Sequence, residues 1–240
     1  MGFDELWPGG PRFLVPDKAF RLGTDSVLLA HFAKTTGKKN IIDLCSGIGV
    51  LAVLCAHKEP AAYIDAAELS DVAAEACAEN LRENGVLKFN VTLGNIREHR
   101  ELFTAGAYDL VLCNPPYFPK NSGMLSPKPE RAAARAEISC TLTDVCETAA
   151  YLCKWGGSFA LVHRPERLSE VFCKMTKHGI EPKRLRLVQN KFDSAPSLAL
   201  IEGKRGSAPG LFIEPPLILT GVDGKESDEV MMMYHRGKYA

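Results

Sequence analysis

The sequence lacks the features that would indicate a membrane protein or a disulfide-stabilised scaffold. No apolar run approaches the ~18 residues that span a bilayer, and the first residues contain no basic stretch followed by an apolar signal core. The eight cysteines form no C-x-x-C pair, and no histidine stands at metal-ligand spacing from them. We therefore expect a cytoplasmic protein with buried, reduced thiols, without a metal ion and without a membrane partner.

The sequence also lacks an excess of charge of either sign. Lys plus Arg and Asp plus Glu number 29 each, which gives no overall signature of nucleic-acid binding. The segment from Lys154 to Gly206 is an exception, because it contains eleven basic and five acidic residues, a net charge of +6. This bias indicates either a phosphate-contacting face or an ordinary solvated surface.

From residue 40 onward, apolar runs of strand length alternate with amphipathic segments of helix length. This pattern predicts an α/β fold in which crossover helices connect parallel strands. The expected strands are Asn40–Cys45, Tyr63–Ala67, Asn90–Leu93, Tyr108–Cys113 and Ser158–His163. The expected helices are Val50–His57, Asp71–Asn84, a short one near Ile96–Phe103, Thr143–Lys154 and Glu166–Lys177.

After Gly179 the pattern changes to two β-like runs, Arg184–Gln189 and Ser197–Glu202, with no helix between them. We expect these runs to pair antiparallel. The whole layout predicts a Rossmann-like sheet of seven strands, mostly parallel, with a C-terminal antiparallel strand and helices on both faces.

The remaining segments lie at the two ends and in one long loop. At 240 residues, the chain is expected to form one domain, with a helical lid at 1–39, a core at 40–206 and a tail at 207–240. Asp25 and Ser26 are the expected caps of the lid helix, and Ser70 is the expected cap of the second core helix. Residues 118–137 read as a polar loop.

A glycine-containing run, Asp43-Leu44-Cys45-Ser46-Gly47-Ile48-Gly49, ends the first core strand and opens a helix. Its glycines allow the backbone to approach a bound nucleoside or amino acid closely, and the helix supplies free amides. The run has neither the G-x-G-x-x-G spacing of dinucleotide sites nor the G-K-[ST] of triphosphate sites.

Two polar residues follow the next two strands. Glu68 ends the second strand, where a carboxylate accepts hydrogen bonds from ribose hydroxyls; capping of the following helix is the alternative. Asn95 follows the third strand and is either an adenine contact or a turn residue. Together with the glycine-containing run, they predict a nucleoside cofactor site.

The run Asn114-Pro115-Pro116-Tyr117 directly follows the fourth strand. Two prolines cannot continue a central strand, so the chain must leave the sheet at its carboxyl edge, beside the cofactor run. The Asn114 Oδ1 and the Pro115 carbonyl can accept hydrogen bonds from an exocyclic amine and localise its lone pair, while Tyr117 offers a stacking face. The alternative is a proline turn whose aromatic ring plugs the domain edge.

These motifs, with Phe20–Leu29 and His163–Leu168, resemble the bacterial tRNA(Val) anticodon-loop adenine N6-methyltransferase family, in particular its Gram-positive branch. The family has the Rossmann-like class I methyltransferase fold, and the resemblance covers about residues 11–220. It implies a monomeric or weakly associating enzyme that uses S-adenosylmethionine and acts on a tRNA. The implied cofactor contacts are Thr24, Asp25, Asp43, Cys45, Ser46, Gly47, Gly49, Glu68, Leu69, Asn95, Ile96 and Asn114.

The sequence departs from the family pattern at two positions. Cys45 replaces a frequent glycine, and Asn95 stands where an acid is common. The backbone at Cys45 need not have a positive φ, so a cysteine is compatible with this position.

The acceptor is left open by the motif alone. The resemblance favours RNA, with Tyr117, Phe118, Arg131, Arg135, Arg164 and Arg167 as candidate contacts, although each arginine is equally well explained as a solvated surface charge. Asn-Pro-Pro-Tyr also occurs in enzymes that methylate a glutamine amide of release factors, and near relatives act on guanine N2 of ribosomal RNA. A cofactor-binding partner protein without turnover is the non-enzymatic alternative.

Overall fold

The computed structural model describes residues 2–16, 22–116 and 140–234. Its central feature is a sheet whose first five strands are parallel to one another. They are β3 (Asn40–Leu44), β4 (Tyr63–Glu68), β5 (Phe89–Leu93), β6 (Tyr108–Cys113) and β7 (Cys153–His163). Several are buried along most of their length, which explains their nearly uniform apolar composition.

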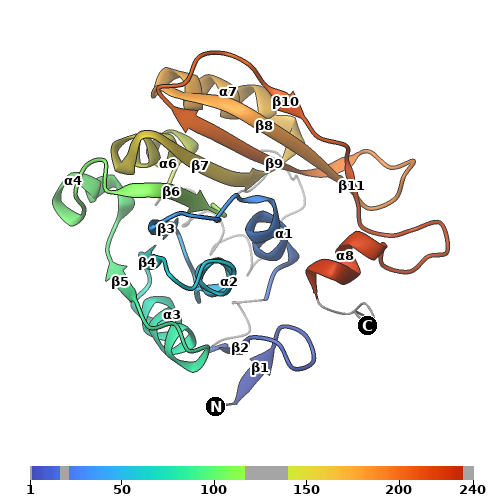
Figure 1. Cartoon of the computed structure of the whole chain (residues 1–240), viewed down its shortest axis with the longest axis horizontal. Helices are drawn as coiled ribbons and strands as arrows, with labels where there is room; N and C mark the ends of the chain where they lie inside the picture. Colours follow the sequence, from blue (N-terminus) through green and yellow to red (C-terminus); the bar gives the residue numbers. More distant parts are fainter. Residues whose placement is uncertain (1, 17–21, 117–139, 235–240) are drawn as a thin grey trace, which may run out of the picture.

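The sheet ends in the predicted antiparallel pair. β8 (Ile180–Gln189) pairs antiparallel with β9 (Pro196–Arg205), and β9 pairs antiparallel with β7. Two further strands from the tail, β10 (Phe212–Ile213) and β11 (Leu217–Ile218), run parallel to β8. The order is β10-β8-β9-β7-β6-β3-β4-β5, and β11 also pairs with β8 (Figure 1). The sheet therefore has nine strands and not the expected seven.

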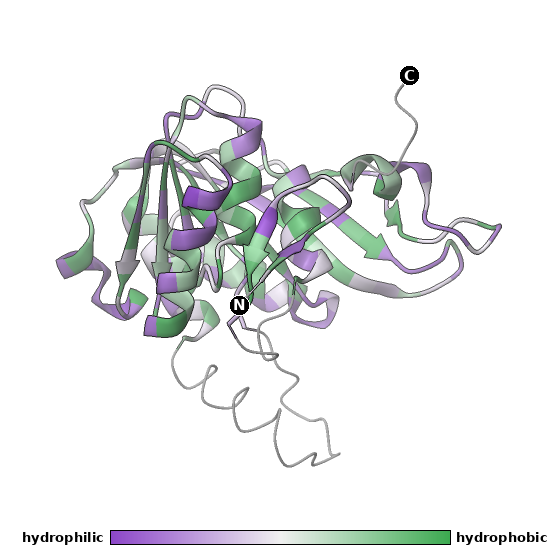
Figure 2. Ribbon diagram, turned by 90° about the horizontal axis from the view of Figure 1, so that it is seen from below, coloured by the Kyte–Doolittle hydropathy of each residue, from purple (hydrophilic) through white to green (hydrophobic). Residues whose placement is uncertain are grey.

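Helices cover both faces of the sheet, as the alternating pattern predicts (Figure 1). One face packs against α1 (Thr24–Phe32), α2 (Val50–Lys58) and α3 (Asp71–Glu83). The other face packs against α4 (His99–Leu102), α6 (Leu142–Leu152) and α7 (Leu168–Lys177). Figure 2 shows apolar residues along the strands and hydrophilic residues recurring on the outer turns of the helices, so the sheet separates two apolar cores.

Helix boundaries agree with the expected ones to within a few residues where capping signals exist. The Ser70 side chain accepts a hydrogen bond from the Ala73 amide at 3.4 Å. Helix α3 ends at Glu83, with Asn84 as its C-cap residue before Gly85, which has a φ of +70°. The expected caps of α1 are wrong, because Gly23 is its N-cap residue and no side chain caps it. Asp25 and Ser26 lie instead within the first turn of that helix.

The first and the last described segments both pack on the core. β1 (Phe3–Glu5) and β2 (Arg12–Leu14) form an antiparallel hairpin that the sequence pattern did not predict, because each strand has only three residues. The buried Asn80 side chain ties it to α3 by accepting from the Leu14 amide at 2.6 Å and donating to its carbonyl at 3.2 Å. At the other end, α8 (Asp228–Met233) lies against α1.

The eight cysteines are all free thiols. Six are buried and Cys45 is half-buried, but Cys173 is exposed on α7, so the expectation of burial is wrong for that residue. Within the three described ranges, no helix is long and apolar enough to cross a membrane.

Candidate functional site

The strand order reverses between β3 and β6. From β3 the chain proceeds through β4 to β5 at one edge of the sheet, and then returns to β6 and β7 on the other side of β3. The crevice outside the carboxyl ends of strands at such a reversal is the usual ligand site of an open α/β sheet. Residues 45–49 follow β3 and Asn114 follows β6, so the two principal motifs flank this point.

The loop at 45–49, which we call the cofactor loop, has three residues with positive φ. Gly47 has a φ of +55°, and no atom lies within 4 Å of the point where a Cβ would project from it; Gly49 has a φ of +84°. A Cβ on Gly49 would lie 2.6 Å from Cys77 Sγ, so glycine there permits the close approach of α2 and α3. Cys45 has a φ of +57°, a positive value that the sequence pattern did not require.

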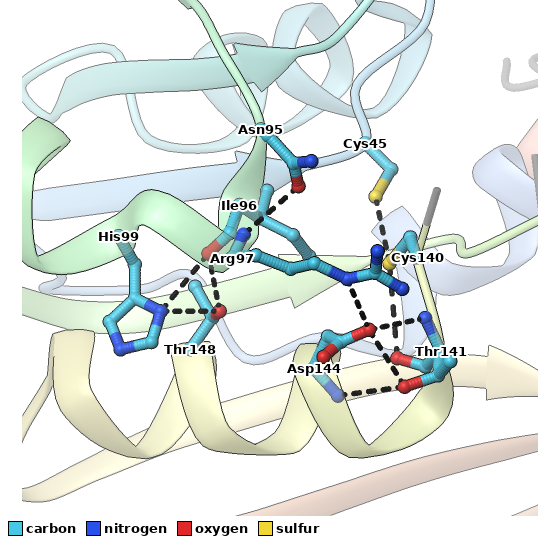
Figure 3. A network of polar contacts seen from close by, with 9 residues as sticks. All are labelled: Cys45, Asn95, Ile96, Arg97, His99, Cys140, Thr141, Asp144 and Thr148. Carbon is cyan, nitrogen blue, oxygen red and sulfur yellow. Dashed lines mark hydrogen bonds and ion pairs between the residues drawn. The ribbon is translucent and has the colours of Figure 1, made fainter. Parts of the chain in front are cut away.

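The Cys45 side chain lies among other thiols. Its Sγ lies 3.9 Å from Cys140 Sγ, next to the start of α6 (Figure 3). Hydrogen bonding to the Cys113 thiol, together with burial, raises the pKa of Cys45 well above its ordinary value. The sulfur is therefore protonated at neutral pH, which is inconsistent with a nucleophilic cysteine at this site.

The Glu68 carboxylate links the cofactor loop to the turn after β4. Its Oε2 accepts from the Gly47 amide at 2.8 Å, and its Oε1 accepts from the Leu69 and Ser70 amides at 2.9 Å each. Glu68 thus contacts the start of α3, although Ser70 is the residue that caps that helix. Leu69 is about half exposed, at 51%.

Asp43 lies at the base of the cofactor loop with 2% of its surface exposed. Its Oδ2 is buried and has no hydrogen-bond partner among the described residues. Burial, and then the nearby charge of Glu68, raise the pKa of Asp43 well above its ordinary value. A cationic or hydrogen-bond-donating ligand beside such a carboxyl group would favour its charged form.

The turn after β5 is held by α6 through a network of polar contacts (Figure 3). Asn95 Oδ1 accepts from the Arg97 amide at 3.1 Å, so Asn95 does act as a turn residue. Arg97 Nε donates to Asp144 Oδ2 at 2.9 Å, and the Ile96 carbonyl accepts from Thr148 Oγ1 at 2.9 Å. These contacts fix the backbone of Asn95 and Ile96 at the carboxyl edge of the sheet.

The acceptor motif is joined to the N-terminal segment. Asn114 Nδ2 donates to Ser26 Oγ at 3.0 Å, while Pro115 is buried. Asp25, in the same turn of α1, has its pKa raised by burial, and the positive charge of Arg164 partly opposes that rise. The first turn of α1, the end of β6 and the residue after β7 therefore meet at the same edge.

The candidate RNA contacts are only partly within the described residues. Arg164 Nη1 donates to the Ser197 carbonyl at 3.2 Å. Arg167 forms a two-bond ion pair with Glu170 at 2.8 and 2.9 Å, so this arginine is already engaged by a carboxylate. Tyr117, Phe118, Arg131 and Arg135 lie outside the described residues.

Similarity to known proteins agrees with this geometry. Residues 19–126 match the methyltransferase small domain family. The chain is 31% identical to the tRNA1(Val) (adenine(37)-N6)-methyltransferase of Tolumonas auensis over 90% of this chain and 88% of that protein. It is 30% identical to the protein of the same name from Aliivibrio salmonicida over 89% of each. The chain belongs to the tRNA1(Val) adenine-N6-methyltransferase family.

Solved structures share the fold of this family member at lower identity. A predicted O-methyltransferase from Agrobacterium tumefaciens has a TM-score of 0.71 at 19% identity, over 90% of this chain and 99% of that one. TrmN from Thermus thermophilus has a TM-score of 0.53 at 16% identity, over 75% of this chain and 48% of that one. The predicted Rossmann-like fold is confirmed, and the protein is a methyltransferase that depends on S-adenosylmethionine.

The cofactor loop of this adenine-N6-methyltransferase family member fits that cofactor. S-Adenosylmethionine has positive charges on its sulfonium and amino groups, and the buried Asp43 carboxyl has an oxygen without a described partner. Gly47 leaves open space where other residues would project a Cβ. The Glu68 carboxylate lies within hydrogen-bonding distance of the Gly47 amide, at the same loop.

Two residues at this edge were not recognised as site residues in the sequence. Ser26 contacts Asn114. Its position next to Thr24 and Asp25 in the N-terminal motif is the sequence signal that could have identified it. His163, the last residue of β7, has 2% of its surface exposed, and burial lowers its pKa to about 4. Its imidazole is therefore neutral at neutral pH.

Proposed function

We propose that this protein transfers a methyl group to N6 of an adenine in the anticodon loop of a tRNA. The relatives described above are named for adenine 37 of tRNA1(Val). The observation that carries the proposal is the position of Asn114, whose side chain lies at the strand-order reversal beside the cofactor loop and whose Nδ2 is bonded to Ser26. This bond leaves the Asn114 Oδ1 as the hydrogen-bond acceptor of the amide.

The chemistry requires an acceptor of this kind. S-Adenosylmethionine supplies an electrophilic methyl group on its sulfonium. The N6 amine of adenine is a weak nucleophile because its lone pair is delocalised into the ring. Asn114 Oδ1 and the Pro115 carbonyl accept hydrogen bonds from the two N–H groups and localise that lone pair, and Pro116 keeps the turn stiff. The transfer would form the N6–C bond as the S–C bond of the sulfonium breaks and a neutral thioether leaves. The cationic methylated amine would then lose its proton to water, so no general base is assigned.

The cofactor contacts follow from the same edge of the sheet. Glu68 accepts hydrogen bonds from the ribose hydroxyls, and the amides near Gly47 and Gly49 line the amino-acid end. We propose that the other expected residues contact the amino-acid end or the adenine ring of the cofactor. They are Thr24, Asp25, Asp43, Cys45, Ser46, Leu69, Asn95, Ile96 and Asn114.

The tRNA contacts are proposed on chemical grounds. An anticodon-loop adenine is single-stranded, so little base-pairing energy opposes its stacking on Tyr117. Phe118, Arg131, Arg135 and Arg164 supply further base or phosphate contacts, and Arg167 joins them only by exchanging its Glu170 partner for a phosphate.

The setting of the enzyme is inferred from the same family. We infer that the chain works as one domain, with lid, core and tail as divided above, and as a monomer or weak homo-oligomer in the cytoplasm, where its tRNA is found. The motifs at Phe20–Leu29 and His163–Leu168 support membership of the Gram-positive branch.

The direct test uses labelled S-adenosylmethionine and unmodified total tRNA, followed by digestion to nucleosides. Label in N6-methyladenosine supports the proposal, and Asn114→Ala serves as the matched inactive variant. Parallel reactions offer release factor or ribosomal RNA in place of tRNA. Label in a release-factor glutamine, or in N2-methylguanosine of ribosomal RNA, without label in tRNA would replace the tRNA assignment with that acceptor. Cofactor binding without transfer to any of the three would indicate a non-catalytic partner protein.

A further inference from the structure

The first turn of α1 provides a specific partner for the Asn114 side chain. Asn114 Nδ2 donates to Ser26 Oγ at 3.0 Å, although 88 residues separate the two in sequence. A primary amide has a donor end and an acceptor end, and in this structure the nitrogen donates to the Ser26 oxygen, so the Asn114 Oδ1 points the other way. Because a hydroxyl can also donate, Ser26 holds this orientation when its own O–H donates to a group other than Asn114. Ser26 therefore turns the Asn114 Oδ1 away from α1.

The opposite end of α1 is anchored by two cations. Lys58 Nζ donates to the Ala30 carbonyl and, at 3.1 Å, to the Ala33 carbonyl. Arg184 donates to the Phe32 carbonyl at 3.0 Å, and its guanidinium lies 4.2 Å from the centre of the Phe32 ring. The last carbonyls of a helix have no partner within the helix, so these bonds fix its C-terminal end.

The anchors connect α1 to the cofactor side of the site. Lys58 belongs to α2, and α2 begins at Val50 immediately after the cofactor loop. Three successive residues of α1, Val27, Leu28 and Leu29, are fully buried in the core that also contains α2. Ser26 thus stands on a helix that is fixed relative to the loop proposed to bind the cofactor.

We propose that Ser26 is a positioning residue for methyl transfer, which orients the Asn114 amide so that its oxygen faces the acceptor amine. This inference rests on the proposed function of Asn114. The terminal torsion of an asparagine is broad and roughly two-fold, so without a partner for Nδ2 the amide also populates the flipped orientation. The flipped amide presents a donor where the acceptor amine requires an acceptor.

The kinetic test compares Ser26→Ala with Ser26→Thr on unmodified tRNA. Ser26→Ala should lower kcat about tenfold, the scale of one hydrogen bond, while the cofactor Kd and the KM for tRNA change less than about twofold. Ser26→Thr keeps the hydroxyl and should restore most of the rate. In an Asn114→Ala background, Ser26→Ala should cause no further loss, because the group that it orients is absent.

A matched control separates positioning from stability. Ser227 caps α8 by accepting from the Val230 amide at 3.3 Å, so Ser227→Ala also removes one serine hydrogen bond at the first turn of a helix. It should leave kcat unchanged. A wild-type kcat in Ser26→Ala, or an additional loss in the double variant, would overturn the inference.

A second measurement needs no substrate. The side-chain amide signal of Asn114 in a nitrogen-15 NMR spectrum is identified by its loss in Asn114→Ala, and it should shift in Ser26→Ala. An unchanged signal would refute the positioning role. A wild-type protein that methylates no tRNA would refute the proposed function, while this signal would still test the contact between Ser26 and Asn114.

Discussion

Replacing Glu68 with glutamine should weaken cofactor binding and also destabilise the protein without cofactor. The carboxylate accepts three backbone N–H groups, one on Oε2 and two on Oε1. A glutamine has only one oxygen, so it can keep the pair from Leu69 and Ser70 only by turning its NH₂ group toward the Gly47 N–H. One charge-assisted hydrogen bond is then lost, and two donors face each other.

The size of this effect follows from the partial exposure of Glu68. A hydrogen bond to a charged group contributes about 1.5–3 kcal/mol, and we take the lower end, about 1.5 kcal/mol, because this side chain is half-buried. For a chain of this length, that loss corresponds to a fall in Tm of roughly 3–6 °C. Loss of the ribose contacts should weaken cofactor binding by about 1–3 kcal/mol in addition.

Calorimetry and thermal unfolding measure the two effects separately. Glu79→Gln is the matched control, because Glu79 is an exposed residue of α3 whose pair with Arg82 contributes little. An unchanged cofactor affinity in Glu68→Gln would refute the ribose assignment. A Tm equal to that of wild type would show that the three amide bonds do not hold the cofactor loop.

Three further outcomes are expected. Asn114→Ala should lower the single-turnover methyl-transfer rate by about 10²–10³-fold with a smaller change in cofactor affinity; a wild-type rate would contradict the acceptor mechanism. Arg184→Met leaves the buried Glu202 without its 2.9 Å partner and should cost about 3–5 kcal/mol in urea unfolding, whereas the exposed Arg82→Met should cost less than about 0.5 kcal/mol. The pKa of His163 is 6.5 in the unfolded chain and about 4 in the folded protein. The folded state therefore favours the neutral imidazole, and the stability that this residue allows is complete above pH 6.5 and is lost as the pH falls toward 4. The slope should approach about 1.4 kcal/mol per pH unit and disappear in His163→Gln; an unchanged pH profile in that variant would exclude this residue as the cause.

The sequence predicts the parallel core of the fold well because each core strand is buried and nearly all apolar. The antiparallel ending is also predictable, since a polar turn and not a helix separates its two runs. The tail strands β10 and β11 were missed because two residues each are too few to show a period of two. Their position depends on pairing with β8, which is a tertiary contact.

The candidate site is predictable in its location but not in its contacts. The ends of β3, β4 and β6 show where polar groups gather, because these strands are easily recognised. The positive φ of Cys45 was missed because a cysteine side chain does not favour it; the loop is held there by Ser46, whose amide donates to the Ala67 carbonyl at 3.1 Å. The bond between Ser26 and Asn114 joins segments that no local pattern connects.

The anchoring of α1 also affects when the enzyme becomes active during its synthesis. Arg184 binds the carbonyl of Phe32, which lies 152 residues earlier in the sequence. At a translation rate of ~5–20 residues per second, roughly 8–30 s pass between the appearance of the two residues. From residue 114 to residue 183, the nascent chain has both Ser26 and Asn114 but lacks Arg184, one of the two cations that fix the C-terminal end of the helix. Because β8 and β9 also complete the central sheet, we expect methyl transfer to appear only after Arg184 and both of these strands have been made.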